Sequence, residues 1–145
     1  AFTPVSGRGV IRRATAGATV IDDSYNANPD SVRAAIELLA GLTGTRVLVL
    51  GDMGEVGNQG PAFHAEIGGY ARERGLETLL ALGEQTRAAV AAFGGPAEHC
   101  AGIETLIEAA RRLSGPGATL LVKGSRFMRM ERVVEALCGD GAAAR

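Results

Sequence analysis

The stretch that decides the fold is I-D-D-S-Y-N-A-N-P-D-S, residues 21–31. An apolar strand pattern leads into it and ends at two carboxylates, Asp22 and Asp23. The stretch ends near Pro29, where a helix can begin with Asn28 as its N-cap. In an open α/β sheet, ligands bind at such junctions between strand and helix. The loop carries more hydrogen-bonding side chains than a turn needs, which predicts that it faces a ligand.

Two more polar loops follow strands that should be buried on both faces. The run T-R-V-L-V-L at 45–50 leads into G-D-M-G-E-V-G-N-Q-G at 51–60, and the run at 118–122 leads into K-G-S-R at 123–126. Such near-continuous apolar runs are typical of parallel strands, whose carboxyl ends lie at one edge of a sheet. We therefore expect these two loops and the loop at 22–28 to converge.

Apolar periodicity predicts an alternation of strands and helices along the chain. The predicted helices cover 29–40, 61–74, 84–93, 103–113 and 128–137, and the remaining strands cover 8–13, 18–22, 78–82 and 98–101. The economical fold is α/β: a Rossmann-like, mainly parallel sheet with helices on both faces and a small antiparallel N-terminal hairpin.

Length and composition restrict the class of protein. The 145 residues predict a single domain, and 46% apolar residues with a net charge of −1 predict an ordered core. Near-neutral charge argues against nucleic acid as a partner, and no apolar run approaches the roughly 20 residues that span a membrane. The two cysteines, Cys100 and Cys138, lack metal-ligand spacing, and we interpret them as idle reduced thiols of a cytoplasmic protein.

The first loop offers Asp23, Tyr25 and Asn26 as ligand-facing residues. Tyr25 has a ring that could stack on a purine, and the alternative is that it merely covers the core. Asn28 is expected to serve only as the helix cap.

The second loop contributes two carboxylates, Asp52 and Glu55. They suit an ammonium group or Mg²⁺, and the alternative is a pair of solvated surface acids. His64, in the first turn of the next predicted helix, is expected to be structural or exposed.

The third loop places Lys123 at a strand end and Ser125 and Arg126 ahead of a predicted helix. A lysine beside a helix N-terminus suits a phosphate or a carboxylate. The alternative is ordinary surface charge.

The chain lacks the phosphate-binding motifs that a nucleotide enzyme would need. It contains no G-x-x-x-x-G-K-[ST], no G-x-G-x-x-G after a strand, and no evident Ser/His/Asp or Cys/His arrangement. We therefore predict no catalytic residue and no phosphate-cradling loop on this chain.

The motifs D-D-S-Y-N-A-N-P-D-S, V-L-G-D-M-G-E-V-G and L-V-K-G-S-R, taken in order and with P-V-S-G-R at 4–8, closely resemble the C-terminal domain of the Mur ligase family. Within that family the pattern is similar to the branch that adds D-alanyl-D-alanine to UDP-N-acetylmuramoyl-tripeptide. The resemblance implies an ATP-dependent amide ligase of peptidoglycan synthesis that works through an acyl phosphate. It also implies that an N-terminal UDP-binding domain and a central P-loop domain, which holds most of the ATP and Mg²⁺ contacts, belong to the same protein and are absent from this chain.

Carried over motif by motif, the resemblance implies two groups of binding residues and no metal ligand on this chain. The ATP side of the cleft would have Arg8, Asp23, Tyr25 and Asn26, and the D-Ala-D-Ala side would have Asp52, Glu55, Lys123, Ser125 and Arg126. Two alternatives stay open: the same domain of another Mur, folate or cyanophycin-type ligase, and a stand-alone nucleotide- or peptide-binding module.

Overall fold

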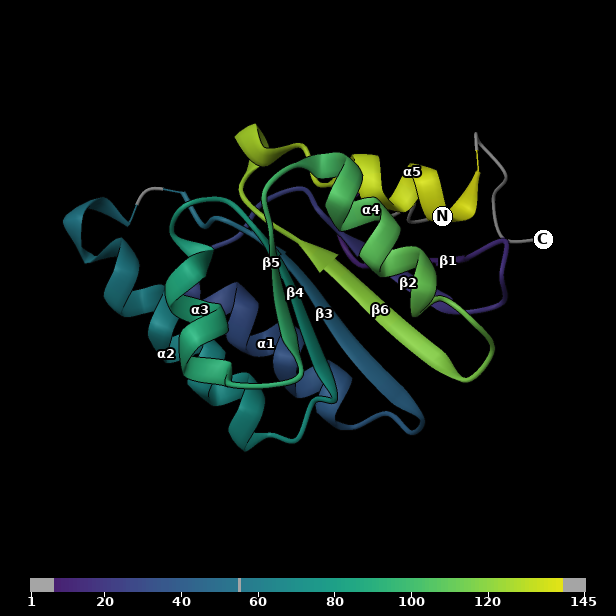
Figure 1. Ribbon diagram of the computed structural model, residues 1–145, viewed down its shortest axis with the longest axis horizontal. Helices are drawn as coiled ribbons and strands as arrows, with labels where there is room; N and C mark the ends of the chain where they lie inside the picture. Colours follow the sequence, from purple (N-terminus) through teal and green to yellow (C-terminus); the bar gives the residue numbers. More distant parts are fainter. Residues whose placement is uncertain (1–6, 55, 140–145) are drawn as a thin grey trace, which may run out of the picture.

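The computed structural model describes residues 7–54 and 56–139, which form one six-stranded sheet covered by helices on both faces (Figure 1). The strands lie in the order β1-β2-β6-β3-β4-β5; β1 pairs antiparallel with β2, and the other described pairs are parallel. Their bounds are β1 Val10–Arg13, β2 Thr19–Asp23, β3 Thr45–Gly51, β4 Thr78–Leu82, β5 Ala97–Cys100 and β6 Ala118–Lys123. This confirms the predicted fold class and its N-terminal hairpin.

Helices α1, α2 and α3 cover one face of the sheet, and α4 and α5 cover the other (Figure 1). Their bounds are α1 Pro29–Ala40, α2 Gly60–Glu73, α3 Thr86–Phe93, α4 Ile103–Arg112 and α5 Glu131–Cys138, and two short 3-10 helices, η1 Gly57–Gln59 and η2 Arg126–Met128, precede α2 and α5.

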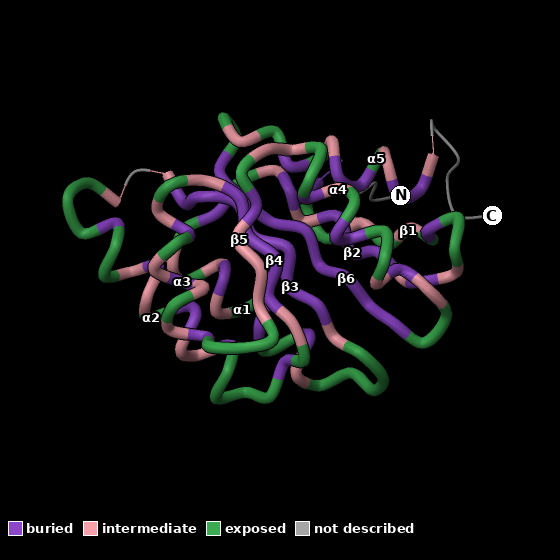
Figure 2. The backbone as a smooth tube through the Cα atoms, viewed as in Figure 1, coloured by how far each residue is buried: buried purple, intermediate pink, exposed green. Residues whose placement is uncertain are grey.

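The central strand β3 shows why the sheet is buried on both sides. Val47 and Val49 pack with the α4 and α5 side, while Leu48 and Leu50 pack with the α1 to α3 side. All four are fully buried, and Figure 2 shows the same burial along the neighbouring central strands. Burying each such side chain stabilises the fold by about 1.5–3 kcal/mol relative to leaving it exposed. The alternate side chains of this continuous apolar run therefore pack into the two hydrophobic cores on opposite faces of the sheet.

The start of α1 lies where the sequence predicts it. The N–H of Ser31 donates to Asn28 Oδ1 over 2.8 Å, and the N–H of Asn28 donates to Ser31 Oγ over 3.0 Å. This reciprocal capping box satisfies backbone donors that a helix start leaves unpaired. It fixes the direction in which the first loop leaves β2.

The last helix was predicted to begin at residue 128, and this is wrong. The turn η2 comes first, then Arg129 adopts a left-handed φ of +52°, and α5 starts at Glu131. The Arg132 guanidinium stabilises the break, because it donates to the carbonyls of Met128 and Arg129. The α-helix N-terminus that was predicted beside Ser125 as an anion site is consequently absent there.

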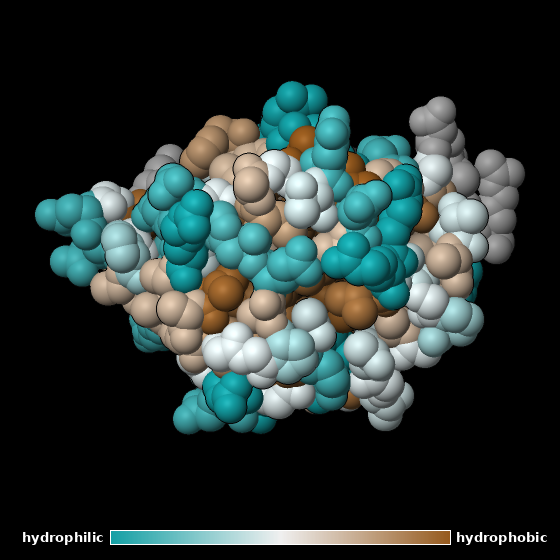
Figure 3. Space-filling view, in the orientation of Figure 1, coloured by the Kyte–Doolittle hydropathy of each residue, from teal (hydrophilic) through white to brown (hydrophobic). Residues whose placement is uncertain are grey.

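Within the described part of the chain, no helix has the length and apolar character needed to cross a bilayer. In the view of Figure 3, hydrophilic residues cover much of the surface and the hydrophobic residues appear in small, separate patches.

Candidate functional site

The carboxyl ends of β2, β6 and β3 meet at one edge of the sheet, as predicted. Lys123 at the end of β6 stands in register with Asp23 at the end of β2. The N–H of Ser125 donates to the Asp52 carbonyl over 2.9 Å, which joins the loops after β6 and β3. We call the described segments that meet here the rim: 22–28, 51–54 and 123–126.

Lys123 is buried within the rim, with 3% of its surface exposed. Its ammonium donates to Asp23 Oδ2 over 3.0 Å and to the Asn26 carbonyl over 2.9 Å. The sequence predicts that Lys123 binds a ligand carboxylate and that Asp23 faces the nucleotide. In the structure these two charges neutralise each other. In this structure Lys123 holds the first loop onto the end of β6.

Asp52 is also buried, and its carboxylate lies at the start of α3. Its Oδ1 accepts from the backbone N–H of Thr86 over 3.0 Å. Gly83 makes room for it, since a Cβ at Gly83 would stand 2.3 Å from Oδ1. A carboxylate at a helix start satisfies an unpaired donor and complements the helix dipole. The structure therefore places Asp52 under α3 and not on the surface of the rim.

Tyr25 lies beside two guanidinium groups. Arg8 Cζ is 3.9 Å from the ring centroid and Arg126 Cζ is 4.6 Å from it. Among the described residues no carboxylate forms an ion pair with either arginine. This brings together residues that the sequence assigned to opposite sides of the cleft. It also places arginines beside the ring on which the sequence predicts that a purine could stack.

A cavity of about 460 Å³ opens on the rim next to this cluster. Its polar lining residues are Asn26, Asn28, Ser125 and Arg126, and the rest of the lining consists of Ala27, Pro29, Gly54, Val56 and Phe127. Ser125 is 2% exposed, and its hydroxyl has no hydrogen-bond partner in the described structure. A buried, unpaired hydroxyl costs about 1–3 kcal/mol unless something pairs with it, so it marks a place for a polar ligand atom.

The sequence reasoning missed the apolar wall of this rim cavity. Phe127 and Val56 were not singled out, and Gly54 was seen only as part of a glycine-rich loop. One signal was present in the sequence: an aromatic residue directly follows the polar K-G-S-R run. Phe127 is 69% exposed and belongs to neither core.

The predictions for Glu55, in the second loop, and for His64, in α2, have different outcomes. Glu55 lies outside the described residues. His64 is structural, as expected: it is fully buried, its Nε2 accepts from the N–H of Met53 over 2.9 Å, and its Nδ1 donates to the Gly60 carbonyl over 2.7 Å. The ring thereby fastens the start of α2 to the loop after β3.

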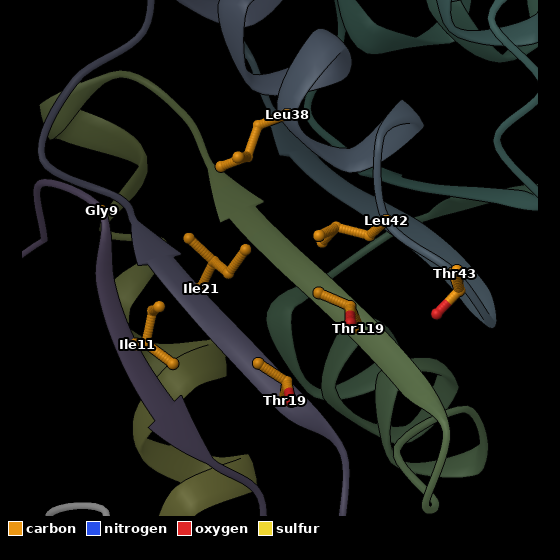
Figure 4. A pocket seen from close by; sticks show the side chains of 8 residues that line it. All are labelled: Gly9, Ile11, Thr19, Ile21, Leu38, Leu42, Thr43 and Thr119. Carbon is orange, nitrogen blue, oxygen red and sulfur yellow. The ribbon is translucent and has the colours of Figure 1, made fainter.

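An apolar groove of about 330 Å³ lies apart from the rim, beside α1 on the side of β1, β2 and β6 (Figure 4). Ile11, Leu38 and Leu42 line it and remain partly exposed, and Thr19 and Thr119 mark the amino ends of β2 and β6. None of its lining residues is titratable, so it offers no side-chain acid or base, and its polar side chains are those of Thr19, Thr43 and Thr119.

The described residues contain no cluster of three or more His, Cys, Asp or Glu side chains that could hold a metal ion. Both cysteines are buried and unpaired, and burial raises the pKa of the Cys100 and Cys138 thiols. A raised pKa disfavours the nucleophilic thiolate.

Comparison with known proteins agrees with the motif resemblance. The family described as Mur ligase, glutamate ligase domain, matches residues 7–126. The UDP-N-acetylmuramoyl-tripeptide–D-alanyl-D-alanine ligase of Escherichia coli K12 is 42% identical over 124 residues, covering 84% of this chain and 27% of that protein. The ligase of the same name from Bacillus subtilis is 32% identical over 128 residues, covering 83% and 28%.

Solved structures give the same result. A MurF crystal structure from Acinetobacter baumannii superimposes with a TM-score of 0.82 at 31% identity, covering 94% of this chain and 31% of that one. The MurF ligase of Thermotoga maritima, in complex with ADP, gives a TM-score of 0.81 at 26% identity, covering 93% and 31%. The chain thus spans less than a third of the length of these relatives. On the family match, the sequence identity and the shared fold, the chain belongs to the Mur ligase family.

Proposed function

We propose that residues 1–145 form the C-terminal domain of an ATP-dependent ligase that joins D-alanyl-D-alanine to UDP-N-acetylmuramoyl-tripeptide in peptidoglycan synthesis. The 42% identity to the Escherichia coli ligase of that name is the observation that carries the proposal. The rim cavity supports it physically, because its lining combines the cation of Arg126, an unpaired hydroxyl and apolar side chains. The UDP-binding and P-loop domains are proposed to belong to the same longer protein.

The dipeptide carboxylate is proposed to bind in the rim cavity. Ser125 Oγ donates one hydrogen bond to it, and Arg126 supplies the cation. Arg8, Tyr25 and Asn26 then border the nucleotide, with Arg8 leaving the ring of Tyr25 to reach a phosphate or ribose. Catalysis by this chain consists of holding the dipeptide in position and excluding water, for which oriented binding supplies much of the barrier reduction.

Three of the predicted binding residues, Lys123, Asp23 and Asp52, take proposed roles that differ from the predicted ones, and Glu55 keeps its predicted role. Lys123 and Asp23 act through each other, since their ion pair sets the position of the first loop. Asp52 acts through its backbone, whose carbonyl holds Ser125 in place. Glu55 is proposed to accept from the dipeptide amine.

ATP and Mg²⁺ are proposed to bind mainly outside this chain. The residues present do not fit either group alone, because the sequence lacks a phosphate-cradling loop and the described residues lack a cluster of metal ligands. When bound, ATP supplies the phosphoryl group that activates the tripeptide carboxylate. This chain closes one side of that site.

The sharpest test is Ser125→Ala in the full-length protein. The hydroxyl makes no internal hydrogen bond, so its removal should leave the unfolding free energy of the chain unchanged or slightly raised. Ligation of D-Ala-D-Ala should lose about tenfold or more in kcat/KM, as for a lost hydrogen bond to substrate. Ser114→Ala is the matched control, since Ser114 is equally buried but donates to the Arg111 carbonyl over 2.8 Å. That variant should lose stability and keep activity; unchanged activity of Ser125→Ala would contradict the assignment.

Calorimetry on the isolated chain separates this proposal from a stand-alone binding module. We expect no detectable heat with ATP or with D-Ala-D-Ala, because the other half of each pocket lies on another domain. Sub-micromolar binding of ATP by the chain alone would favour the stand-alone module.

A further inference from the structure

We propose that Gly54 and Phe127 form a size gate that limits the side chain of the C-terminal residue in the dipeptide substrate. This inference rests on the proposed function, because it takes the rim cavity as the dipeptide site. It adds two residues that act on specificity and not on the reaction itself.

The lining of the rim cavity combines polar and apolar residues. Ser125 and Arg126 supply polar groups, and Phe127, Val56 and Pro29 supply apolar surface. A carboxylate attached to a carbon with a short apolar side chain matches both kinds of surface. The buried, unpaired hydroxyl of Ser125 fixes where the carboxylate goes, so the side chain must point toward the apolar wall.

Gly54 is a glycine for reasons of space. Its φ lies outside the left-handed region, so the backbone conformation does not require glycine. A Cβ placed there would stand 3.2 Å from Ser125 Cβ and 3.7 Å from Phe127 Cε1. A methyl group at position 54 would therefore press on Ser125, and the gap beside Phe127 stays open only because residue 54 has no side chain.

Phe127 forms the other side of this gap. It is 69% exposed and packs in neither core, so the fold does not need its ring. A ring held beside the Gly54 gap covers a small side chain well and collides with a branched or aromatic one. Discrimination by one or two carbon atoms in an apolar pocket is about 10- to 200-fold.

The test uses the full-length ligase with three dipeptides: D-Ala-Gly, D-Ala-D-Ala and D-Ala-D-Val. Phe127→Ala should raise the kcat/KM for D-Ala-D-Val relative to D-Ala-D-Ala by about tenfold. Gly54→Ala should lower the kcat/KM for D-Ala-D-Ala relative to D-Ala-Gly by about tenfold. Ile11→Ala is the matched control, because Ile11 is similarly exposed, at 65%, and lies in the groove away from the rim.

The outcomes separate the two proposals. If the wild-type enzyme ligates D-Ala-D-Ala and the two ratios in Phe127→Ala and Gly54→Ala stay within twofold of the Ile11→Ala control, the size gate is wrong and the proposed function stands. If the wild-type enzyme ligates none of the dipeptides, the proposed function itself fails. Should Gly54→Ala not fold, Phe127→Ala decides alone, because an exposed ring can be removed without opening a core.

Discussion

Replacement of Lys123 by methionine tests how the rim is held together. Methionine has a similar length and removes the charge, so the change isolates the ammonium. The variant leaves the Asp23 carboxylate without its partner at 3.0 Å and the Asn26 carbonyl without its donor at 2.9 Å. We expect the first loop to lose its attachment to β6 and the whole chain to lose stability.

The expected loss is about 3 kcal/mol. Breaking a buried ion pair by removing one partner costs about 3–5 kcal/mol, whereas an exposed pair is worth about 0.2–1 kcal/mol. The side chain of Lys123 is 4% exposed, which places the pair in the first class. The side chain of Asp23 is 28% exposed, so water can partly solvate the stranded carboxylate, and this favours the lower end of the range.

Urea unfolding of the chain at pH 7 measures this loss, and a double-mutant cycle with Asp23→Asn assigns it. The double variant should recover most of the loss of either single variant, because both charges are then gone. Arg74→Met is the control: the Arg74–Glu37 pair has a similar distance, 2.9 Å, but both side chains are more than 40% exposed. If Lys123→Met costs no more than Arg74→Met, the rim does not depend on this pair and the reasoning is refuted.

Three further predictions concern packing, capping and pH. Gly68→Ala should cost about 2 kcal/mol or more in urea unfolding, because its Cβ would stand 2.1 Å from a carbonyl oxygen of α3, whereas Gly69→Ala faces open space and should stabilise by up to about 1 kcal/mol. Asp52→Ala removes the acceptor at the start of α3 and should cost about 1–2 kcal/mol; an unchanged Tm would contradict that role. An arginine partner holds the pKa of Glu77 below its usual value, so the pair contributes stability above the pKa of the unfolded carboxyl and loses it as pH falls through the folded pKa. Glu77→Gln should therefore lower stability by less than about 1 kcal/mol at pH 7 and leave it unchanged near pH 2.

The sequence predicted the fold well because the governing rules are local. Asn28, Pro29 and the apolar spacing along α1 gave that helix its observed bounds, and the continuous apolar run before residue 51 gave a strand buried on both faces. Convergence of the three loops then followed from parallel topology alone. Apolar spacing failed where polar side-chain bonds decided the local structure. At η2, Arg132 donates to the carbonyls of Met128 and Arg129 and caps a turn in a segment whose apolar spacing predicts a helix.

Side-chain pairing in the site could not be predicted for a related reason. Lys123 and Asp23 are 100 residues apart, and sequence reasoning assigned each charge to a separate ligand. Whether two such charges lie 3 Å or 8 Å apart depends on the register of β2 against β6, which no motif encodes. Asp52 shows the same difficulty, because its partner is a backbone N–H on an element 34 residues away.

The distribution of charge on the rim limits what the chain can bind. Its buried charges, on Asp22, Lys123 and Asp52, are satisfied within the protein, as a low-dielectric environment requires. The charges still free to act lie on Arg8 and Arg126 near solvent, beside the unpaired hydroxyl of Ser125. This set favours an anion, and no acid lines the described part of the rim cavity to receive an amine. Under the proposed function, these residues would hold the carboxylate end of the dipeptide, and its amine would find an acceptor elsewhere, on Glu55 or on another domain.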